Sequence, residues 1–446
     1  MKKYLNRFDV FSIVLGSIIG WGAFMLPGTK FLSKAGVINT AIGLILGTIC
    51  IIIIEKNYRV MMECHREEGG EFSFTYKYLG EKHGFIVGWF LILAYLTMIP
   101  LNATAFPLVV EKLFGGILKF GYLYKIAGSP VYFGEVLTSA IVIILFAYIN
   151  IKGIKSTSKI QNIIIILLVI MIFSVFIGMI FKTNKEVIIS NYLNNYSFNL
   201  KEVLTIFAIT PFAFIGFDAI PQLSQEFKFS PKKASMVAII SLSIGTLIYN
   251  ILNITTAMAY SRNDAILKHW ALGSAVFEFL GTFGFILLII ALTAAVISGI
   301  NGFMICTTKL IGSVSSKGMI WDRLSMKNKD GVLKNAIIFT SIISLIAPWF
   351  GREVINVIVN MSSLGASIAY LYVSFIVFKN NNVFSKRIFG ILGILISLLF
   401  IFLLLVPSSP ASLKSVELFA LSLWILFGGI FYFVKSNRKR NVNINN

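Results

Sequence analysis

Charged residues and cysteines are both scarce in this sequence. Asp, Glu, Lys and Arg together make up 13% of the 446 residues, whereas hydrophobic residues make up 57%. Soluble globular domains carry about 25% charged residues, so this composition excludes an ordinary soluble protein. The three cysteines, Cys50, Cys64 and Cys306, do not indicate a disulfide framework. The three histidines are not spaced as metal ligands, so we expect no metal site and no cofactor.

Apolar segments of membrane-spanning length, in contrast, recur from one end of the chain to the other. A helix needs about 20 apolar residues to cross the hydrocarbon core of a bilayer. No polar interval is long enough for a soluble domain, so we predict an all-α integral membrane protein with twelve transmembrane helices. The expected spans are 8–32, 36–55, 84–113, 131–149, 160–181, 201–226, 234–260, 279–311, 335–350, 353–378, 388–406 and 413–434. A further amphipathic helix is expected near 72–80.

The formal net charge of +20 reflects topology. Basic residues concentrate in the segments that this span order places on one side, together with both ends of the chain. The positive-inside rule makes that side cytoplasmic. We therefore expect a multi-pass protein of the cell membrane with both termini in the cytoplasm. It would contact membrane lipid and bind no nucleic acid.

The first apolar segment contains three glycines within seven positions, Gly16, Gly20 and Gly22. Each costs about 1 kcal/mol of helix propensity relative to alanine and lets the backbone leave helical angles. A break at mid-membrane exposes unpaired backbone groups, which hydrocarbon tolerates only where they line a cavity or bind a ligand. Two interpretations follow from this stretch alone. It is half of a substrate site, or it is a face of small residues for close helix packing.

The sixth span contains a second break, because Pro211, Gly216 and Pro221 interrupt one short stretch. Asp218, in the same stretch, is the one charged residue near the middle of a predicted span. An ionisable group there costs several kcal/mol and marks a functional candidate. We therefore predict that Asp218 acts in gating or proton coupling. The alternative is that it caps the second half of the span by accepting from an amide near Ile220.

The two breaks occupy equivalent places in the order of spans. They fall in the first and sixth helices, so each opens a unit of five spans, and an odd number inverts the second unit. Paired breaks at corresponding positions are the best sequence pointer to the site of a transporter. This favours the substrate-site interpretation. It divides the chain into a first repeat at 1–182, a second repeat at 183–380, and two extra helices with a short basic tail at 381–446.

Ordered motifs resemble the amino acid–polyamine–organocation (APC) superfamily of transporters. The run from Gly16 to Phe24, followed by Pro27-Gly28, is similar to that family's GxxIGxGxF…PG signature, and Gly69-Gly70-Glu71-Phe72 is similar to its glycine-pair loop. The further matches are Asn150 to Ser156, Phe214 to Asp218, Ser230 to Ala234 and Ser298 to Asn301. The ordered set covers about 8–350. The resemblance implies a LeuT-like fold, a five-plus-five inverted repeat in which helices 1 and 6 are broken.

The resemblance also implies that the two breaks hold an amino acid by its carboxylate and ammonium groups. The backbone N–H groups of Trp21 and Gly22 would bind the carboxylate at the positive end of a half-helix. The carbonyls of Ile18, Phe212 and Ile215 would accept from the ammonium group. Phe212 or Phe214 would cover the substrate, the alternative being ordinary core packing. The predicted substrate-binding set is Ser17, Ile18, Gly20, Trp21, Gly22, Phe212, Ala213, Phe214, Ile215 and Gly216.

Two positions depart from the family pattern. Trp21 stands where relatives often have a small residue; it narrows the pocket towards small substrates or swings aside as a wall. Many relatives carry a lysine in span five beside the broken first helix. The pattern places Leu168 there, and residues 160–180 contain no lysine. The coupling ion is therefore left open.

These observations predict a secondary active transporter that moves amino acids, or related amines, by alternating access, coupled to protons or to exchange. A sodium-coupled amino acid symporter is the alternative, with the carbonyls of Gly16 and Ile19 and the Ser298 hydroxyl as oxygen ligands. An alternative from another class is a non-transporting sensor or binding protein on the same fold. An enzyme is disfavoured, because we find no nucleophile–base pair, metal cluster or paired intramembrane carboxylates.

Overall fold

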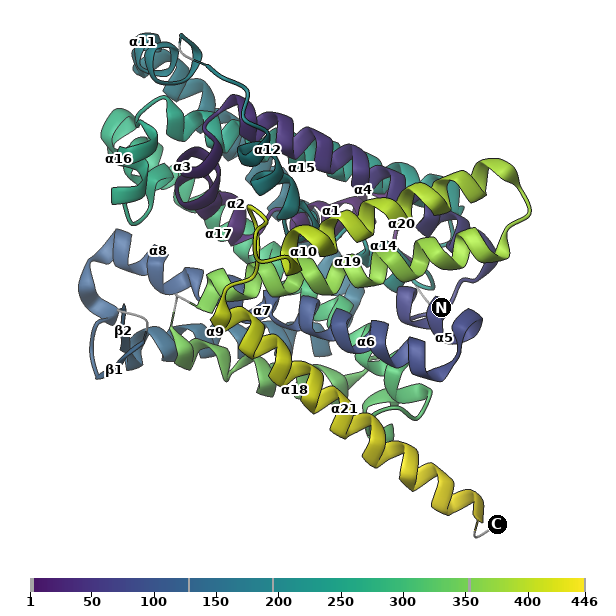
Figure 1. Ribbon diagram of the computed structural model, residues 1–446. Coiled ribbons are helices and arrows are strands. Elements are labelled where there is room, and N and C mark those ends of the chain that lie inside the picture. Colours follow the sequence, from purple (N-terminus) through teal and green to yellow (C-terminus); the bar gives the residue numbers. More distant parts are fainter. Residues whose placement is uncertain (1–3, 127–128, 195, 352–353, 445–446) are drawn as a thin grey trace.

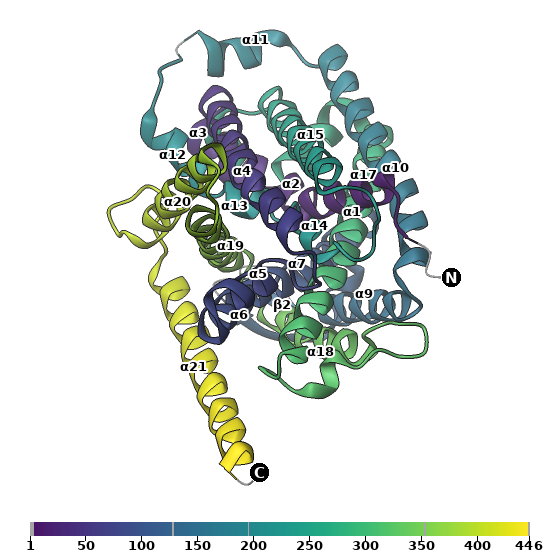
Figure 2. The ribbon, with the colours of Figure 1, turned by 90° about the vertical axis from the view of Figure 1, so that its right-hand side faces the viewer.

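The computed structural model describes residues 4–126, 129–194, 196–351 and 354–444, and helices make up most of it. Figure 1 shows α5 and the first described residues at one end of the helical bundle, with α3, α8, α16 and the two strands at the opposite end. In the turned view, α1, α2 and α14 lie at the centre, whereas α21 projects from the margin (Figure 2). The segments that carry the predicted breaks therefore occupy the interior.

The elements of the first half are α1 Arg7–Ile18, α2 Trp21–Leu26, a π-helical turn Pro27–Phe31, α3 Leu32–Ala35, α4 Ile38–Cys64, α5 Gly70–Leu79, α6 Glu81–Leu96, α7 Met98–Ala103, α8 Ala105–Phe114, β1 Tyr122–Ile126, β2 Ser129–Tyr132, α9 Phe133–Ile151 and α10 Ile154–Lys182. Those of the second half are α11 Lys185–Ile188, α12 Leu200–Ala208, α13 Thr210–Ala213, α14 Ala219–Gln222, α15 Pro231–Ala257, α16 Arg262–Leu267, α17 Ala271–Ser316, α18 Lys334–Ser344, α19 Val354–Asn380, α20 Phe384–Leu405 and α21 Ser415–Ile444.

Many of these helices are long and apolar enough to cross a membrane. Within the described residues nine qualify singly, and a tenth is formed by the bent pair 7–18 and 21–35. The protein is therefore a multi-pass, helical membrane protein. The count of twelve spans and the inverted repeat stay predictions.

The third predicted span is interrupted twice. The segment 81–114 is divided into α6, α7 and α8, which end at Leu96, Ala103 and Phe114. Pro100 and Pro107 each follow one of the two internal ends by a few residues, because proline removes a backbone donor and clashes with the preceding turn. The helix predicted near 72–80 is also present as α5, whose Phe72 and Phe74 side chains are buried.

Two expectations need correction. The all-α prediction missed a small antiparallel pair of strands, β1 and β2, between α8 and α9. Tyr and Val residues, which favour strands, dominate that segment. The eighth span, expected at 279–311, belongs to a longer element, 271–316, with a bend at Gly281 where φ is +62°.

Candidate functional site

The first break separates α1 from α2, and the chain bends there by 41° between the segments 7–18 and 21–35. Gly20 is extended there and would place a Cβ atom 2.7 Å from Asn102 Oδ1. The absence of a side chain lets Asn102, on α7, approach the break closely. Its Oδ1 accepts a hydrogen bond from the Trp21 N–H at 2.9 Å. The predicted carboxylate donor at Trp21 is thus bonded to a neighbouring amide oxygen in this structure.

The second break lies between α13 and α14 and touches the first. Gly216 has φ of +121°, and a Cβ atom there would lie 2.5 Å from Ser17 Cβ. Glycine is required at this position both by the backbone angle and by the contact. The Ser17 hydroxyl turns away and donates to the Ile13 carbonyl at 2.8 Å. The two interruptions therefore face each other across a direct contact.

Asp218 bonds to the backbone inside the second break. Its Oδ1 accepts from the Gly216 N–H at 2.8 Å, and it makes no side-chain cap to α14. The alternative that Asp218 caps an amide near Ile220 is therefore wrong, because the carboxylate turns back to Gly216, two residues earlier. Asp218 is fully buried, and its Oδ2 has no hydrogen bond of good geometry within the described part of the chain.

Tyr249, on α15, joins the two breaks. Its hydroxyl lies 3.2 Å from the Ile18 carbonyl and 3.2 Å from the Ala213 carbonyl. A hydroxyl carries one proton, so it donates to one carbonyl at a time. The predicted acceptor Ile18 therefore lies in a two-carbonyl site, but its companion is Ala213. The predicted acceptor Phe212 instead receives the Ile215 N–H at 3.2 Å.

A cavity of about 20 Å³ lies between the breaks, which is room for a single water molecule. Seven predicted residues line it: Ser17, Ile18, Gly20, Trp21, Gly22, Phe212 and Ile215. Three do not: Ala213, Phe214 and Gly216. Ala213 presents only its carbonyl, and Phe214 packs edge-on against the Tyr249 ring instead of covering the cavity. Phe212 is the aromatic wall, opposite Gly22.

The cavity has no charged wall. Its remaining lining residues are Met98, Leu101, Asn102, Tyr249 and Phe303, so none of the described side chains around it is ionised at neutral pH. Trp21 supplies one further polar atom, because its indole Nε1 is buried without a partner among the described residues. Asn102 and Tyr249 were missed from the sequence. Little in the sequence singles them out, because other polar residues, such as Thr97 in span three and Asn250 in span seven, lie close to them.

The proposed sodium ligands have another partner. Ser298 Oγ accepts from Gln161 Nε2 on α10, and the same nitrogen donates to the Ser12 carbonyl of α1 at 3.2 Å. A Cβ atom at Gly16 would collide with both Gln161 and Ser298. An uncharged amide donor therefore lies beside the oxygens that were suggested for a cation. Asn301 completes the group by donating to Gln161 Oε1 at 3.2 Å.

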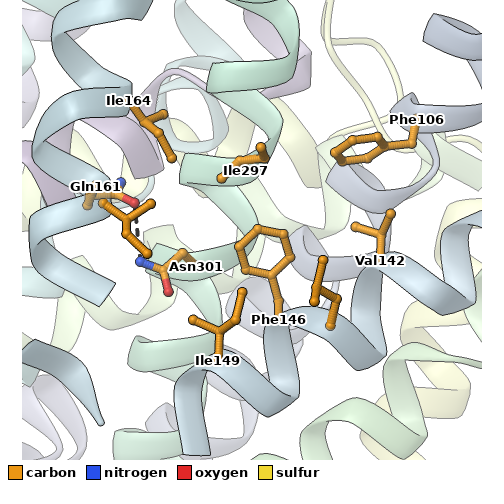
Figure 3. A pocket seen from close by; sticks show the side chains of 10 residues that line it. Phe106, Val142, Phe146, Ile149, Gln161, Ile164, Ile297 and Asn301 are labelled. Atoms are coloured by element: carbon orange, nitrogen blue, oxygen red, sulfur yellow. Dashed lines mark hydrogen bonds between the residues drawn. The ribbon is translucent and has the colours of Figure 1, made fainter. Parts of the chain in front are cut away.

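A larger cavity, of about 280 Å³, lies on the other side of this amide group (Figure 3). Phe106, Val142, Phe146 and Ile297 surround it, and Gln161 and Asn301 are its polar edge. Such a wall offers an amino acid no partner for its two charges. The smaller cavity at the breaks is therefore the candidate substrate site.

At the α5 end, Lys309, Glu68 and Glu226 form an ion network. Lys309 Nζ lies 2.8 Å from Glu68 Oε1 and also contacts Glu226. Burial alone would raise the pKa of Glu68, but the ammonium groups of Lys309 and Lys327 hold it below its usual range. Arg66 adds a bond of 2.6 Å to the Ser224 carbonyl. These contacts tie the loop after α14 to the loop before α5.

Comparison with known proteins identifies the family. The sequence profile of the family described as amino acid permease matches residues 5–431, nearly the whole chain. The chain therefore belongs to the amino acid permease family, as the APC resemblance predicted.

Individual relatives share a quarter or so of their residues with this chain. A methylthioribose transporter of Bacillus subtilis is 28% identical over 56% of this chain and 53% of its own length. An aspartate-proton symporter of the same organism is 25% identical over 83% of this chain and 71% of its own length. A branched-chain amino acid permease of Lactococcus lactis is 23% identical over 84% and 81%. The match spans about half the length of the first of these relatives.

Proposed function

We propose that this protein is a secondary active transporter of amino acids. The observation that carries the proposal is that the Asn102 and Tyr249 side chains bond to the backbone groups that would bind the carboxylate and ammonium groups of an amino acid. Asn102 Oδ1 takes the hydrogen bond that a carboxylate would take from Trp21 N–H, with Gly22 beside it. The Tyr249 hydroxyl lies within hydrogen-bond distance of the Ile18 and Ala213 carbonyls and donates to either one, where an ammonium group would bind. A substrate would displace both contacts and replace them with its own charged groups.

The cavity favours a neutral amino acid. An acidic side chain would need a cationic partner and a basic side chain an anionic one, because a buried unpaired charge is strongly unfavourable. The described lining offers neither. Since the cavity now holds about 20 Å³, binding requires the Trp21 or Phe212 ring to move outward. The names of the relatives include aspartate and branched-chain amino acids, and the uncharged wall supports the second of these classes.

Transport would proceed by alternating access of two five-helix units, 1–182 and 183–380, around the breaks. The α5 end would face the cytoplasm, as the basic loops indicate. The ion network of Lys309, Glu68 and Glu226 would then be the inner gate, closed in this conformation. Asp218 would contribute to gating and to proton coupling.

Proton coupling is favoured over sodium coupling by the Gln161 amide. A sodium ion at the Gly16, Ile19 and Ser298 oxygens would have to displace the Gln161 N–H that already bonds to Ser298. Indifference of uptake to replacement of Na⁺ by K⁺ is the expected result. Uptake that requires Na⁺ would instead establish the symporter alternative.

The test begins with thermal unfolding of the purified protein against each of the twenty amino acids and methylthioribose. Leucine, serine or another neutral amino acid is expected to stabilise the protein, by about 2.7 kcal/mol at a hundredfold excess over Kd. Aspartate, lysine and arginine are expected to be inactive. Stabilisation by methylthioribose alone would overturn the substrate class. Counterflow in proteoliposomes then separates a transporter from a sensor, because a sensor binds tightly without counterflow.

A further inference from the structure

The helix α5 is docked onto the second half of span six through a pair of glycines. Gly69 and Gly70 have φ of +98° and +49°, and a Cβ atom at Gly70 would lie 2.8 Å from Gln222 Nε2. The same Gln222 nitrogen lies 3.3 Å from the Gly69 carbonyl and donates to Glu71 Oε2 at 2.9 Å. The glycine-pair motif therefore brings the Glu71 carboxyl group against α14, directly after the turn that holds Asp218.

Glu71 is fully buried, as is Asp218. Burial, and then the neighbouring Asp218 charge, raises the pKa of Glu71 well above its usual range. The Tyr95 hydroxyl lies 3.5 Å from Glu71 Oε1 and close to the Asp218 carboxyl group. Two carboxyl groups from different elements thus share one enclosed site that sequence spacing did not predict.

The titratable groups around this pair are uncharged or weakly acidic. The titratable neighbours are Tyr58 of α4, Tyr95 of α6, Cys306 of α17 and Tyr370 of α19. We find no basic side chain among the described groups that face the pair. The hydroxyls of Tyr58 and Tyr370, Gln222 Oε1 and Asp218 Oδ2 are all buried without a hydrogen bond of good geometry. The Tyr58 hydroxyl faces the Glu71 carboxyl group and the Tyr95 hydroxyl faces the Asp218 carboxyl group, so hydroxyl groups surround the pair.

We propose that Glu71 and Asp218 together form the proton-binding site of this carrier, a role that rests on the proposed proton-coupled transport. Two buried carboxylates close together cannot both be ionised, so the pair retains one proton while it is enclosed. Asp218 Oδ2 lacks a strong donor, which a shared proton supplies. The site therefore binds a proton in the closed conformation.

Release of the proton would accompany separation of α5 from α14. Opening the network of Lys309, Glu68 and Glu226 would admit water to the Glu71 face. The carboxyl O–H bond would then break, the proton would pass to water, and both carboxylates would be solvated. Proton release and opening of the α5 end would thus be one event, and Glu71 would link the gate to the break in span six.

The test compares wild type with Glu71→Gln, Asp218→Asn and the double variant. Glu63→Gln is the matched control, because Glu63 pairs with Arg59 in a more exposed position near the same end. The first readout needs no substrate. Infrared difference spectra of the purified proteins, taken between acidic and alkaline pH, report the C=O band of a protonated buried carboxyl group. We expect that band in wild type and Glu63→Gln, at shifted pH in each single variant, and its loss in the double variant.

The second readout is uptake of labelled L-leucine and L-serine into proteoliposomes under an inward proton gradient. Glu71→Gln and Asp218→Asn are expected to lose accumulation but retain counterflow, and the double variant to be no worse than either. Glu71→Asp restores a carboxyl group and is expected to regain accumulation, which guards against a folding defect. If Glu71→Gln titrates in the infrared like wild type and accumulates substrate like wild type, the proposal that Glu71 and Asp218 form the proton-binding site is overturned. Failure of wild type itself to respond to the gradient would instead overturn the proposed proton coupling.

Discussion

The two helix breaks satisfy their backbone groups in different ways. The break after α1 depends on other helices, because Asn102 of α7 accepts from Trp21 and Tyr249 of α15 donates to Ile18. The break after α13 is largely self-contained: Asp218 accepts from Gly216, and successive turns bond Phe217 to Phe214 and Ala219 to Gly216. A hydrogen bond to a side chain of another helix can be replaced by one to a ligand. Hydrogen bonds within the break instead fix its backbone conformation. The first break is thus suited to binding and the second to rigid support.

The largest effect is expected where the two breaks touch. Gly216→Ala would force a non-glycine residue to φ of +121° and drive its Cβ atom into Ser17. The combined strain and overpacking should lower the free energy of unfolding by about 2–5 kcal/mol. Thermal or denaturant unfolding of the purified protein measures it. Gly429→Ala is the control, because nothing lies within 4 Å of the atom that it adds. Equal stability of the two variants would show that the second break is not rigid.

Removal of the Asn102 acceptor should have the next largest effect. Asn102→Leu keeps the size of the side chain but leaves the buried Trp21 N–H unpaired. This should cost the empty protein about 1–3 kcal/mol. A bound neutral amino acid would restore the missing bond, so its stabilising effect should exceed that seen in wild type. Thermal unfolding with and without L-leucine and L-serine tests both statements. A variant that loses stability and gains nothing from either ligand would contradict the exchange.

Substitution of Tyr249 should change the free energy of unfolding by a smaller amount. Tyr249→Phe retains the ring, which packs against Phe214 and Phe31, and removes only the hydroxyl. Its loss should cost about 0.5–1.5 kcal/mol, because one shared donor is removed from two carbonyls. Affinity for a neutral amino acid should rise, since the ammonium group no longer competes with the hydroxyl. Isothermal titration measures it, and weaker binding would identify the hydroxyl as a substrate contact instead.

The smallest effect is expected outside the breaks, in the ion network of the α5 end. Glu68→Gln should destabilise the protein at neutral pH by on the order of 1 kcal/mol, because Lys309 keeps Glu226 as a partner. The folded pKa of Glu68 lies below its unfolded value, so its contribution is present above the unfolded pKa and is lost as pH falls through the folded one. The stability difference from wild type should therefore vanish in acid. A difference that persists there would point to packing rather than charge.

The backbone features of the site could be predicted from the sequence, because glycine and proline act locally. Gly20 and Gly216 lie in the two interruptions. The helix ends within the third span lie a few residues before Pro100 and Pro107. The partners could not be predicted. Asn102 is 81 positions from Trp21, and Tyr249 is 231 positions from Ile18, so their contacts depend on which helices pack together. For the same reason the family pattern drew attention to Leu168, whereas Gln161, two turns earlier on α10, makes the hydrogen bonds to α1 and α17.

Gln161 has a consequence for the electrical behaviour of the protein. It fastens α1, α10 and α17 together by an amide that carries no charge at any physiological pH. The membrane potential does about 2.3 kcal/mol of work per elementary charge for each 100 mV, and it does none on this junction. A neutral amino acid is a zwitterion and adds no net charge either. Under the proposed proton coupling, any current during transport would therefore report the proton alone, and its ratio to substrate flux would count the protons moved in each cycle.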